Sequence, residues 1–480
     1  MSISNVIKSI QNIMRKDAGT YGDAQRIEQL GWMLFLKIMD DRDSEREMLE
    51  GDYVSPLPDE LRWSNWANNP EGITGEALLH FVDNELIPQL RELPVQGQNP
   101  RRKIIRNVFE YANNYMKNGT LMRQVINKVN EIDFNSSEDR HMFGDIYEHI
   151  LKDLQSAGNA GEFYTPRAVT QFIVDMISPQ LGESVLDPAC GTGGFLVSAI
   201  ENMRNQVNNV KDEEVLQKSF KGIDKKYLPH ILCTTNMLLH DMDVPSWIRH
   251  DNALSRPLRD YGPKDRFDVI VTNPPFGGME EDGIETNFPA TFRTRETADL
   301  FLVLIINLLK PGGRCGIVLP DGVLFGEGVE TRIKEKLVSE CNLHTIVRLP
   351  SGVFNPYASI RTNLLFFTKG EPTKDVWYYE HPYPPGYKSY SKTKPIRLEE
   401  FKAEKEWWNN RQETEQAWKV SVEQIKEANF NLDFKNPNKP ADDLGDPDEL
   451  LAEYKTLDSQ ISELRNELKQ ELVNCLEDQK

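Results

Sequence analysis

Residues 184–195 read Ser-Val-Leu-Asp-Pro-Ala-Cys-Gly-Thr-Gly-Gly-Phe, a pattern typical of a β-strand that ends in an acid and is followed by a glycine turn. Glycine lets the backbone approach a ligand closely and adopt dihedral angles that other residues avoid. The turn lacks the spacing of G-x-G-x-x-G and the Lys-Ser/Thr pair of a phosphate loop. The stretch therefore predicts a ligand-binding strand, turn and helix, and it disfavours nicotinamide dinucleotides and nucleoside triphosphates.

Short β-rich runs alternate with helical stretches between residues 160 and 370, on both sides of this unit. The expected strands are 184–187, 220–224, 247–251, 267–272, 314–319, 345–349 and 363–368. Strands that alternate with helices form a mostly parallel sheet with helices on both faces. We therefore predict an α/β fold built on a doubly wound, mostly parallel, Rossmann-like sheet.

The first 155 residues have apolar side chains that return at helical spacing, for example Ile27, Leu30, Leu34 and Ile38. No group of catalytic residue types occurs among them. We predict an all-helical N-terminal domain, residues 1–155, followed by the sheet domain, residues 156–435. This division agrees with the length of the chain, because 480 residues are too many for one average domain.

The chain after the predicted sheet shows three further patterns. Residues 377–390 are rich in Tyr and Pro and are expected to be irregular, and the charged stretch with Trp407, Trp408 and Trp418 is expected to be helical. Residues 436–440 indicate a break. A linker and helical tail, residues 436–480, then carries apolar residues at coiled-coil spacing: Tyr454, Leu457, Ile461, Leu464 and Leu468. The pattern alone leaves two alternatives open, a coiled-coil helix and a helix packed on its own domain.

The composition limits the compartment and the partners. The longest apolar run, residues 300–309, has about half the length needed to cross a bilayer. The chain has five cysteines and no Cys-x-x-Cys pair, which favours a reducing compartment such as the cytoplasm. The net charge of −19 is unusual for a protein that binds nucleic acid alone. A nucleic-acid substrate would therefore require locally clustered basic residues or a second subunit.

Acidic residues end three successive predicted strands. Asp224 and Asp251 each lie about one strand–helix–strand step after the previous acid, the first of which is Asp187. The carboxyl ends of parallel strands are where open α/β sheets bind ligands. Each carboxylate could merely cap the following helix, but three in series favour a ligand with hydroxyl or amine donors.

The predicted strand 267–272 ends in Asn273-Pro274-Pro275-Phe276. Asn273 and Pro274 each precede a proline, so both are held in extended conformations. The Asn273 side chain and the Pro274 carbonyl can then accept the two N–H bonds of an exocyclic amine, which would make its nitrogen more nucleophilic. Phe276 could stack on the ring that carries the amine. The alternative is a plain turn that ends the strand. It does not explain why the motif lies about one strand–helix–strand step after the last of the three acids.

At these residues the sequence resembles the S-adenosylmethionine-dependent amino-methyltransferases, and most closely the modification (M) subunits of type I restriction-modification systems. Residues 144–148 (GDIYE) and 158–167 (GNAGEFYTPR) resemble family signatures, and 429–433 (NFNLD) resembles the segment after the catalytic domain. The order, with 158–167 before the glycine loop, is that of the gamma class. The match covers essentially the whole chain.

The resemblance implies roles for the site residues, with S-adenosylmethionine as the cofactor and no metal. The segment that would line the methionine part of the cofactor pocket is Glu162, Phe163, Tyr164, Thr165, Pro166 and Arg167. The residues that would wrap the methionyl group are Asp187, Ala189, Cys190, Gly191, Thr192 and Gly193. Asp224 would bind the ribose hydroxyls, and Asp251, with its neighbour Asn252, the cofactor adenine. The catalytic residues that would hold the target base are Asn273, Pro274, Pro275 and Phe276.

The resemblance also implies a function: methyl transfer to the N6 amine of a flipped-out adenine in double-stranded DNA, the activity of EC 2.1.1.72. In this family a specificity (S) subunit reads the DNA sequence, two M subunits flank it, and a restriction (R) subunit can join. The acidic charge suits this division of labour. We expect the C-terminal helix, residues 450–472, to pack against the S subunit.

Two other functions share parts of the pattern. Asn-Pro-Pro followed by an aromatic residue also occurs in methyltransferases that act on RNA or on protein glutamine, and an inactive domain could serve as an assembly scaffold. The ordered set of motifs argues against the first, and the intact Asp187, Asp224, Asp251 and Asn273 argue against the second. For the polar stretch 277–299, with Arg293 and Arg295, a loop that closes on DNA and an ordinary surface loop are both left open.

Overall fold

The computed structural model describes residues 3–95, 101–134, 164–243, 247–355, 360–391 and 393–438, and five residue pairs between 454 and 469. The predicted domain boundary at residues 155 and 156 and the signature 144–148 lie outside these residues. So do Glu162 and Phe163, the first two residues of the predicted cofactor segment. The signature 158–167 is described only from Tyr164 onward.

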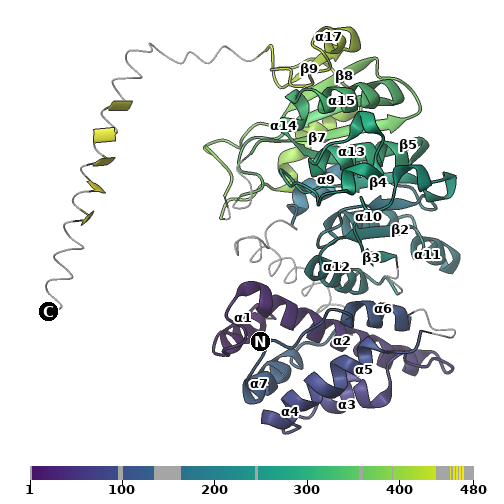
Figure 1. Ribbon diagram of the computed structural model, residues 1–480, viewed down its shortest axis with the longest axis vertical. Helices are drawn as coiled ribbons and strands as arrows, with labels where there is room; N and C mark the ends of the chain where they lie inside the picture. The colour runs from purple at the N-terminus through teal and green to yellow at the C-terminus, as the bar shows by residue number, and fades with distance from the viewer. Residues whose placement is uncertain are drawn as a thin grey trace.

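The N-terminal region is helical, as predicted (Figure 1). Its α-helices are α1 (Ile3–Met14), α2 (Asp23–Leu49), α3 (Trp63–Trp66), α4 (Gly75–Phe81), α5 (Ile87–Arg91), α6 (Arg101–Phe109) and α7 (Gly119–Val129). The long α2 forms because its apolar residues recur at helical spacing, and Ile27, Leu30, Leu34 and Ile38 are all buried. Trp32 of α2 packs edge to face on Phe109 of α6, with ring centroids 6.3 Å apart.

The described residues after this region form one nine-stranded sheet in the order β3-β2-β1-β4-β5-β7-β6-β8-β9. The strands are β1 (Val185–Asp187), β2 (Phe220–Asp224), β3 (Ile248–His250), β4 (Phe267–Thr272), β5 (Leu309–Pro320), β6 (Cys341–Arg348), β7 (Thr362–Lys369), β8 (Asp375–Glu380) and β9 (Ala417–Ser421). β1 to β5 pair in parallel, β7 runs antiparallel between β5 and β6, and β9 pairs antiparallel with β8. The predicted mostly parallel sheet is confirmed.

Helices cover both faces of this sheet. The helices are α9 (Arg167–Ile177), α10 (Gly194–Arg204), α11 (Val210–Leu216), α12 (Tyr227–Leu239), α13 (Thr297–Leu308), α14 (Asp321–Phe325), α15 (Val329–Glu340), α16 (Lys402–Trp408) and α17 (Val422–Glu427). α9 and α10 share one buried apolar core with the sheet, and α13 and α15 share the other. These two cores make the doubly wound arrangement. Within the described residues, none of the helices combines the length and apolar character required to span a membrane.

Two predictions about the region after residue 370 are wrong. Residues 377–380, expected to be irregular, belong to β8, and Trp418, expected in a helix, lies in β9; only Trp407 and Trp408 lie in a helix, α16. Tyr378 of β8 stacks on Trp418 of β9, with centroids 5.3 Å apart. Tyr and Trp favour strands because their rings pack well against cross-strand neighbours. The prolines that suggested irregular structure come only after β8 ends.

The helical region and the sheet region meet at α2 and α12. The buried core of the helical region continues onto Ile231, Leu232 and Leu238 of α12. At the edge of this contact, Arg42 pairs with Asp241 and Arg46 pairs with Asp243. α12 directly follows β2, so its packing on both sides fixes the position of the carboxyl end of β2, where Asp224 lies.

The described pairs of the C-terminal tail are helical, as the 3-4 spacing predicts. Four residues of the apolar seam are exposed: Tyr454, Ile461, Leu464 and Leu468. The fifth residue of the seam, Leu457, lies outside the described residues. A helix that packed on its own domain would bury these side chains, so their exposure favours the coiled-coil alternative.

Candidate active site

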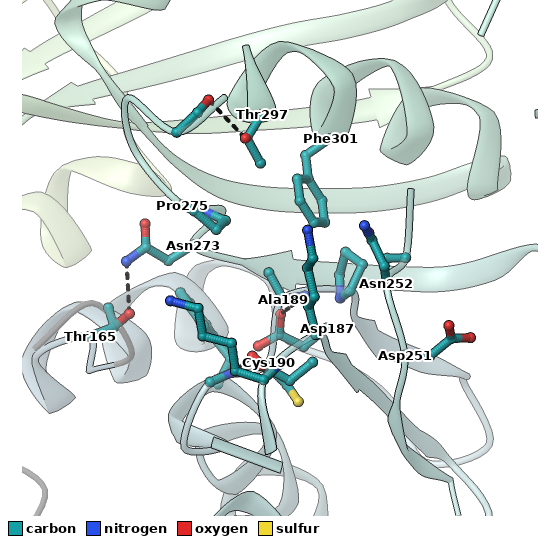
Figure 2. Close-up of a pocket in the computed structure, with 18 of the residues that line it drawn as sticks. Thr165, Asp187, Ala189, Cys190, Asp251, Asn252, Asn273, Pro275, Thr297 and Phe301 are labelled. Atoms are coloured by element: carbon teal, nitrogen blue, oxygen red, sulfur yellow. Dashed lines mark hydrogen bonds between the residues drawn. The ribbon is translucent and has the colours of Figure 1, made fainter. Parts of the chain in front are cut away.

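A pocket of about 340 Å³ opens at the carboxyl ends of β1, β2, β3 and β4 (Figure 2). Predicted site residues that line it are Thr165, Asp187, Ala189, Cys190, Gly191, Thr192, Asp224, Asp251, Asn252, Asn273 and Pro275. The topology explains why residues far apart in the sequence meet here. Parallel strands in the order β3-β2-β1-β4 present all their carboxyl ends on one edge of the sheet.

Asp187 ends β1 at the bottom of the pocket and is buried. Its Oδ1 accepts hydrogen bonds from the Thr272 hydroxyl, at 2.7 Å, and from the Ala189 backbone N–H, at 3.1 Å. Its Oδ2 has no hydrogen-bond partner among the described residues. Burial raises the pKa of Asp187 to about 7, against the lowering effect of these two hydrogen bonds. One carboxylate oxygen is thus held in place while the other is available to a ligand.

The glycine turn after β1 contacts the carboxyl end of β2. Gly191 and Gly193 have positive φ angles, 52° and 85°, which side chains rarely allow. A Cβ on Gly193 would also lie 2.9 Å from the Cys233 sulfur of α12. The Gly191 N–H donates to Asp224 Oδ2 at 3.0 Å, and the Lys226 N–H donates to Asp224 Oδ1 at 2.9 Å. Asp224 is therefore oriented by the backbone at the pocket wall.

Asp251 and Asn252 follow β3, but they differ in environment. The Asp251 side chain is half exposed and lies 3.8 Å from Arg249. Asn252 Oδ1 accepts from the Leu254 N–H at 2.9 Å, and its Nδ2 donates to Glu280 Oε2 at 3.2 Å. Asn252 is thus the more firmly held of the two residues at the outer end of the pocket.

Asn273 directly follows β4, at the opposite end of the pocket from Asn252 (Figure 2). Its Nδ2 donates to the Thr165 hydroxyl at 2.9 Å. Its Oδ1 is buried and, within the described part of the chain, has no hydrogen-bond partner. A buried acceptor without a partner costs free energy, so this oxygen marks a place where a ligand N–H would bind.

Comparison with known proteins identifies the family. The profile of the N-6 DNA methylase family matches residues 138–444, and that of the HsdM N-terminal domain matches residues 3–129. The type I restriction enzyme EcoEI methylase subunit of Escherichia coli is 61% identical over 98% of this chain and 97% of its own length. The chain belongs to the methylase subunits of type I restriction enzymes.

Other relatives of this methylase subunit agree. The EcoKI methylase subunit of Escherichia coli is 30% identical over 74% of this chain and 66% of its own length. A modification subunit of a putative type I restriction enzyme from Vibrio vulnificus has a TM-score of 0.83 at 46% identity, covering 91% of this chain and 97% of that one. A chain from a structure of type I complex assembly and conformational transition has a TM-score of 0.81 at 38% identity, with 99% of both chains covered. The activity predicted from the sequence, methylation of adenine N6 in DNA, is that of this family.

Several predicted site residues of the methylase subunit lie outside the pocket lining. Arg167 donates to the Gly194 carbonyl at 3.0 Å and pairs with Glu201 at 2.8 Å, so it braces α9 against α10. The Phe276 ring packs edge to face on Phe354, with centroids 5.8 Å apart. The remaining predicted residues that the lining does not include are Tyr164, Pro166, Gly193 and Pro274.

The pocket of the methylase subunit also contains residues to which the sequence analysis gave no role in the site. They are Pro188, Gly194, Phe195, Lys225, Lys226, Ala253, Gly278, Met279, Glu280, Thr297 and Phe301. Lys225 and Lys226 could have been found, because they directly follow Asp224 at a strand end. Glu280 and Phe301 lie in the loop and helix after β4, where no local pattern marks them.

The stretch 277–299 is held in place by several contacts. Both the backbone N–H and the hydroxyl of Thr297 donate to the Gly278 carbonyl, at 3.0 and 2.8 Å. The Arg295 guanidinium donates to the Glu280 carbonyl at 3.1 Å and pairs with Asp282 at 2.9 Å. Arg295 thus braces the loop, and the base of the loop forms part of the pocket wall.

Proposed function

We propose that this pocket binds S-adenosylmethionine and that Asn273, with the Pro274 carbonyl, receives the N6 amine of an adenine flipped out of DNA. The observation that carries the proposal is the buried Asn273 Oδ1, which lacks a hydrogen-bond partner among the described residues at the end of the pocket. An exocyclic amine supplies the N–H donor that this oxygen requires. The neutral amide acts as an acceptor and not as a base.

The residues of the pocket fit this cofactor. Asp187 Oδ2, which has no partner in the described chain, can accept from the α-amino group of the methionyl part. The positive φ of Gly191 and Gly193 brings the backbone close to that part. Asp224 would accept from the ribose hydroxyls, and Asp251 and Asn252 would contact the cofactor adenine. When bound, S-adenosylmethionine supplies an electrophilic methyl group on a sulfonium.

The catalytic contribution of the chain is positioning and hydrogen bonding. Thr165 accepts from Asn273 Nδ2, so the Asn273 amide is turned with its oxygen toward the incoming base. Hydrogen bonds from the amine to Asn273 Oδ1 and the Pro274 carbonyl draw the nitrogen lone pair out of the purine ring. The target base has to leave the duplex to reach this depth.

We propose that the methylase subunit acts in the cytoplasm with a specificity subunit that reads the DNA, two methylase subunits to one specificity subunit, and that a restriction subunit can join. Two features of the chain support the participation of a second subunit in DNA binding. The net charge of −19 opposes tight binding to phosphates by this chain alone. The exposed apolar seam of the tail, Tyr454, Ile461, Leu464 and Leu468, suits packing against a partner helix.

The test is methyl transfer from S-adenosylmethionine labelled with tritium in the methyl group. Wild-type protein is incubated with DNA, with RNA and alone, each with and without the specificity subunit. We expect label on adenine N6 of DNA, with full activity only when the specificity subunit is present. Label on RNA or on protein, or none on DNA with the partner present, would contradict the proposal.

The partner helix has its own test. Deletion of the residues after Pro447 is expected to abolish co-purification with the specificity subunit while cofactor binding stays unchanged. A complex that survives the deletion contradicts the role of the tail but leaves the catalytic proposal intact.

A further inference from the structure

The chain leaves β6 and β8 at the same edge of the sheet as it leaves β4. β4 pairs in parallel with β5, and both β5 and β6 run antiparallel to β7. β6 therefore has the direction of β4, and β8 pairs with β6 in parallel. Residues 349–355, after β6, and residues 381–391 and 393–397, after β8 (the β8 loop), thus start from the carboxyl edge where Asn273 follows β4.

Aromatic side chains connect the β8 loop to Phe276. The Phe276 ring packs edge to face on Phe354, in the chain after β6, with centroids 5.8 Å apart. From the β8 loop, the Tyr383 hydroxyl donates to the Ser351 carbonyl at 2.8 Å. The Tyr383 ring lies 5.5 Å from that of Tyr390, which is buried. The β8 loop is therefore packed against the same short segment that contacts Phe276.

The β8 loop differs in charge from the chain as a whole. Acids outnumber Lys and Arg by 75 to 56 in the sequence, whereas residues 381–397 contain four Lys or Arg residues and no Asp or Glu. Four acids and two lysines line the pocket at the carboxyl ends of β1 to β4. The carboxyl edge of the sheet is therefore mainly acidic around the pocket and basic after β8.

Two cations of the β8 loop are available to an anion. Lys388 and Lys394 are exposed, and within the described residues neither forms an ion pair. Lys394 Nζ lies 5.2 Å from the centroid of the Tyr387 ring, a contact that keeps the lysine against the aromatic residues of the loop. Arg397, by contrast, lies 3.4 Å from Glu400 Oε1, which compensates part of its charge.

Duplex DNA is the anion that the proposed reaction brings to this edge. DNA carries one phosphate charge for about every 1.7 Å of its helix axis. When the target adenine enters the pocket beside Asn273, the phosphates on either side of that nucleotide remain outside the pocket, at the carboxyl edge. Lysines at this edge can bind them whatever the base sequence, since phosphate contacts carry no sequence information.

We propose that the β8 loop is the surface through which the methylase subunit holds the DNA backbone next to the flipped adenine, with Lys388 and Lys394 as phosphate contacts. The proposal rests on the proposed function and deepens it, because it names where this chain meets its polyanionic substrate. A chain with a net charge of −19 can approach DNA in this way because positive charge is gathered locally after β8.

The experiment uses the complex of the full-length methylase subunit with the specificity subunit and a fluorescent duplex of mixed sequence. Fluorescence anisotropy gives the dissociation constant of the duplex at several salt concentrations. We expect Lys388→Ala/Lys394→Ala to weaken binding by roughly tenfold at physiological salt and to reduce the slope of log K against log[salt] by about two, one for each phosphate contact. The affinity for S-adenosylmethionine should stay within about twofold of wild type, because neither lysine lines the pocket and exposed charges are screened.

Two further variants separate charge at this surface from other causes. Lys211→Ala/Lys218→Ala removes two exposed lysines from the segment that leads into the amino end of β2, at the opposite edge of the sheet, and should leave duplex binding near wild type. Lys388→Arg/Lys394→Arg keeps both charges and should bind the duplex within about twofold of wild type. The assignment is overturned if the first variant weakens binding as much as Lys388→Ala/Lys394→Ala, or if arginine binds no better than alanine.

A protein partner at this surface would give a different result. If the β8 loop contacts the specificity subunit instead of DNA, Lys388→Ala/Lys394→Ala will prevent co-purification of the two subunits, and the proposed DNA contact is wrong. If the wild-type complex neither binds the duplex nor methylates unmodified DNA, the proposed function itself is wrong. If wild type does both and the alanine variant has the same affinity and salt slope, only the role of the β8 loop is wrong.

Discussion

The two ends of the pocket are built from different chemistry. At the cofactor end, Asp187 and Asp224 are carboxylates that backbone N–H groups and a hydroxyl hold in place. At the proposed target-base end, Asn273 is a neutral amide whose side chain donates to the Thr165 hydroxyl. Under the proposed function, charge is used where the cationic cofactor binds, and a neutral acceptor is used where the amine is activated.

The difference has a physical reason. The proposed cofactor carries charge in every turnover, so charged and preoriented groups contribute to its affinity. The target amine is neutral and very weakly basic, because its lone pair is delocalised into the purine ring, so a hydrogen-bond acceptor can orient it without an opposite charge. The Asn273 amide oxygen supplies that acceptor. Substitutions at the two ends should therefore separate turnover from cofactor affinity.

The largest effect is expected at the target-base end. Asn273→Ala removes the acceptor for the amine and should lower the rate of adenine methylation by roughly a thousandfold. The dissociation constant of S-adenosylmethionine should change by less than about threefold. Single-turnover methylation and calorimetry measure the two quantities, with the exposed Asn208→Ala as the control. Retained methylation by Asn273→Ala would remove the central argument for the catalytic site.

Asp224→Asn should reverse this pattern at the cofactor end. The amide keeps the size of the side chain but loses the charge and one acceptor for the ribose hydroxyls. We expect S-adenosylmethionine to bind about twentyfold more weakly, with the turnover at saturating cofactor little changed. Asp212→Asn, a partly exposed acid in the first turn of α11, is the matched control. A loss of turnover without a loss of affinity would show that the two ends are not separate.

The same contrast explains what could be predicted from the sequence. The strands from 184 to 272 and the acids at their ends were predictable, because each depends on a local pattern, an apolar run followed by an acid or a glycine turn. The pairing of Asn273 with Thr165 was not, since it joins residues 108 positions apart. Likewise, Glu280 Oε2 accepts hydrogen bonds from Lys225 and Asn252, and these three residues meet only because β4 lies two strands from β2 in the sheet.

The predictions for β8 and β9, at the far edge of the sheet, failed for a different reason. β8 and β9 carry Trp and Tyr beside charged residues, and prolines follow closely, so composition favoured loop and helix over strand. What decides their structure is the stacking of Tyr378 on Trp418 and the bond from the Tyr378 hydroxyl to the Leu432 carbonyl at 2.9 Å. These contacts exist only once the sheet has formed, so no local pattern could indicate them.

A smaller effect should appear in the pH dependence of cofactor binding. Burial raises the pKa of Asp187 to about 7, so in the free protein this carboxyl is largely protonated below that pH and charged above it. The cationic amino group of the cofactor favours the charged form. Binding of S-adenosylmethionine should therefore weaken as the pH falls below 7, by roughly tenfold at pH 6, and level off above 8. Calorimetry from pH 5.5 to 8.5 measures this, and Asp187→Asn should bind weakly with a flat profile.

The smallest effect is expected at the contact that orients the catalytic amide. Thr165→Val keeps the shape of the side chain but removes the acceptor for Asn273 Nδ2, so the amide is free to turn its oxygen away from the base. The loss of one neutral hydrogen bond corresponds to about 1 kcal/mol, or roughly a fivefold lower methylation rate. Cofactor affinity should stay near wild type, although Thr165 also lines the pocket. Thr165→Ser, which restores the hydroxyl, should recover the rate. If valine and serine lowered the rate equally, the methyl group would be the important part of Thr165, and the base end would depend on packing and not on an oriented acceptor.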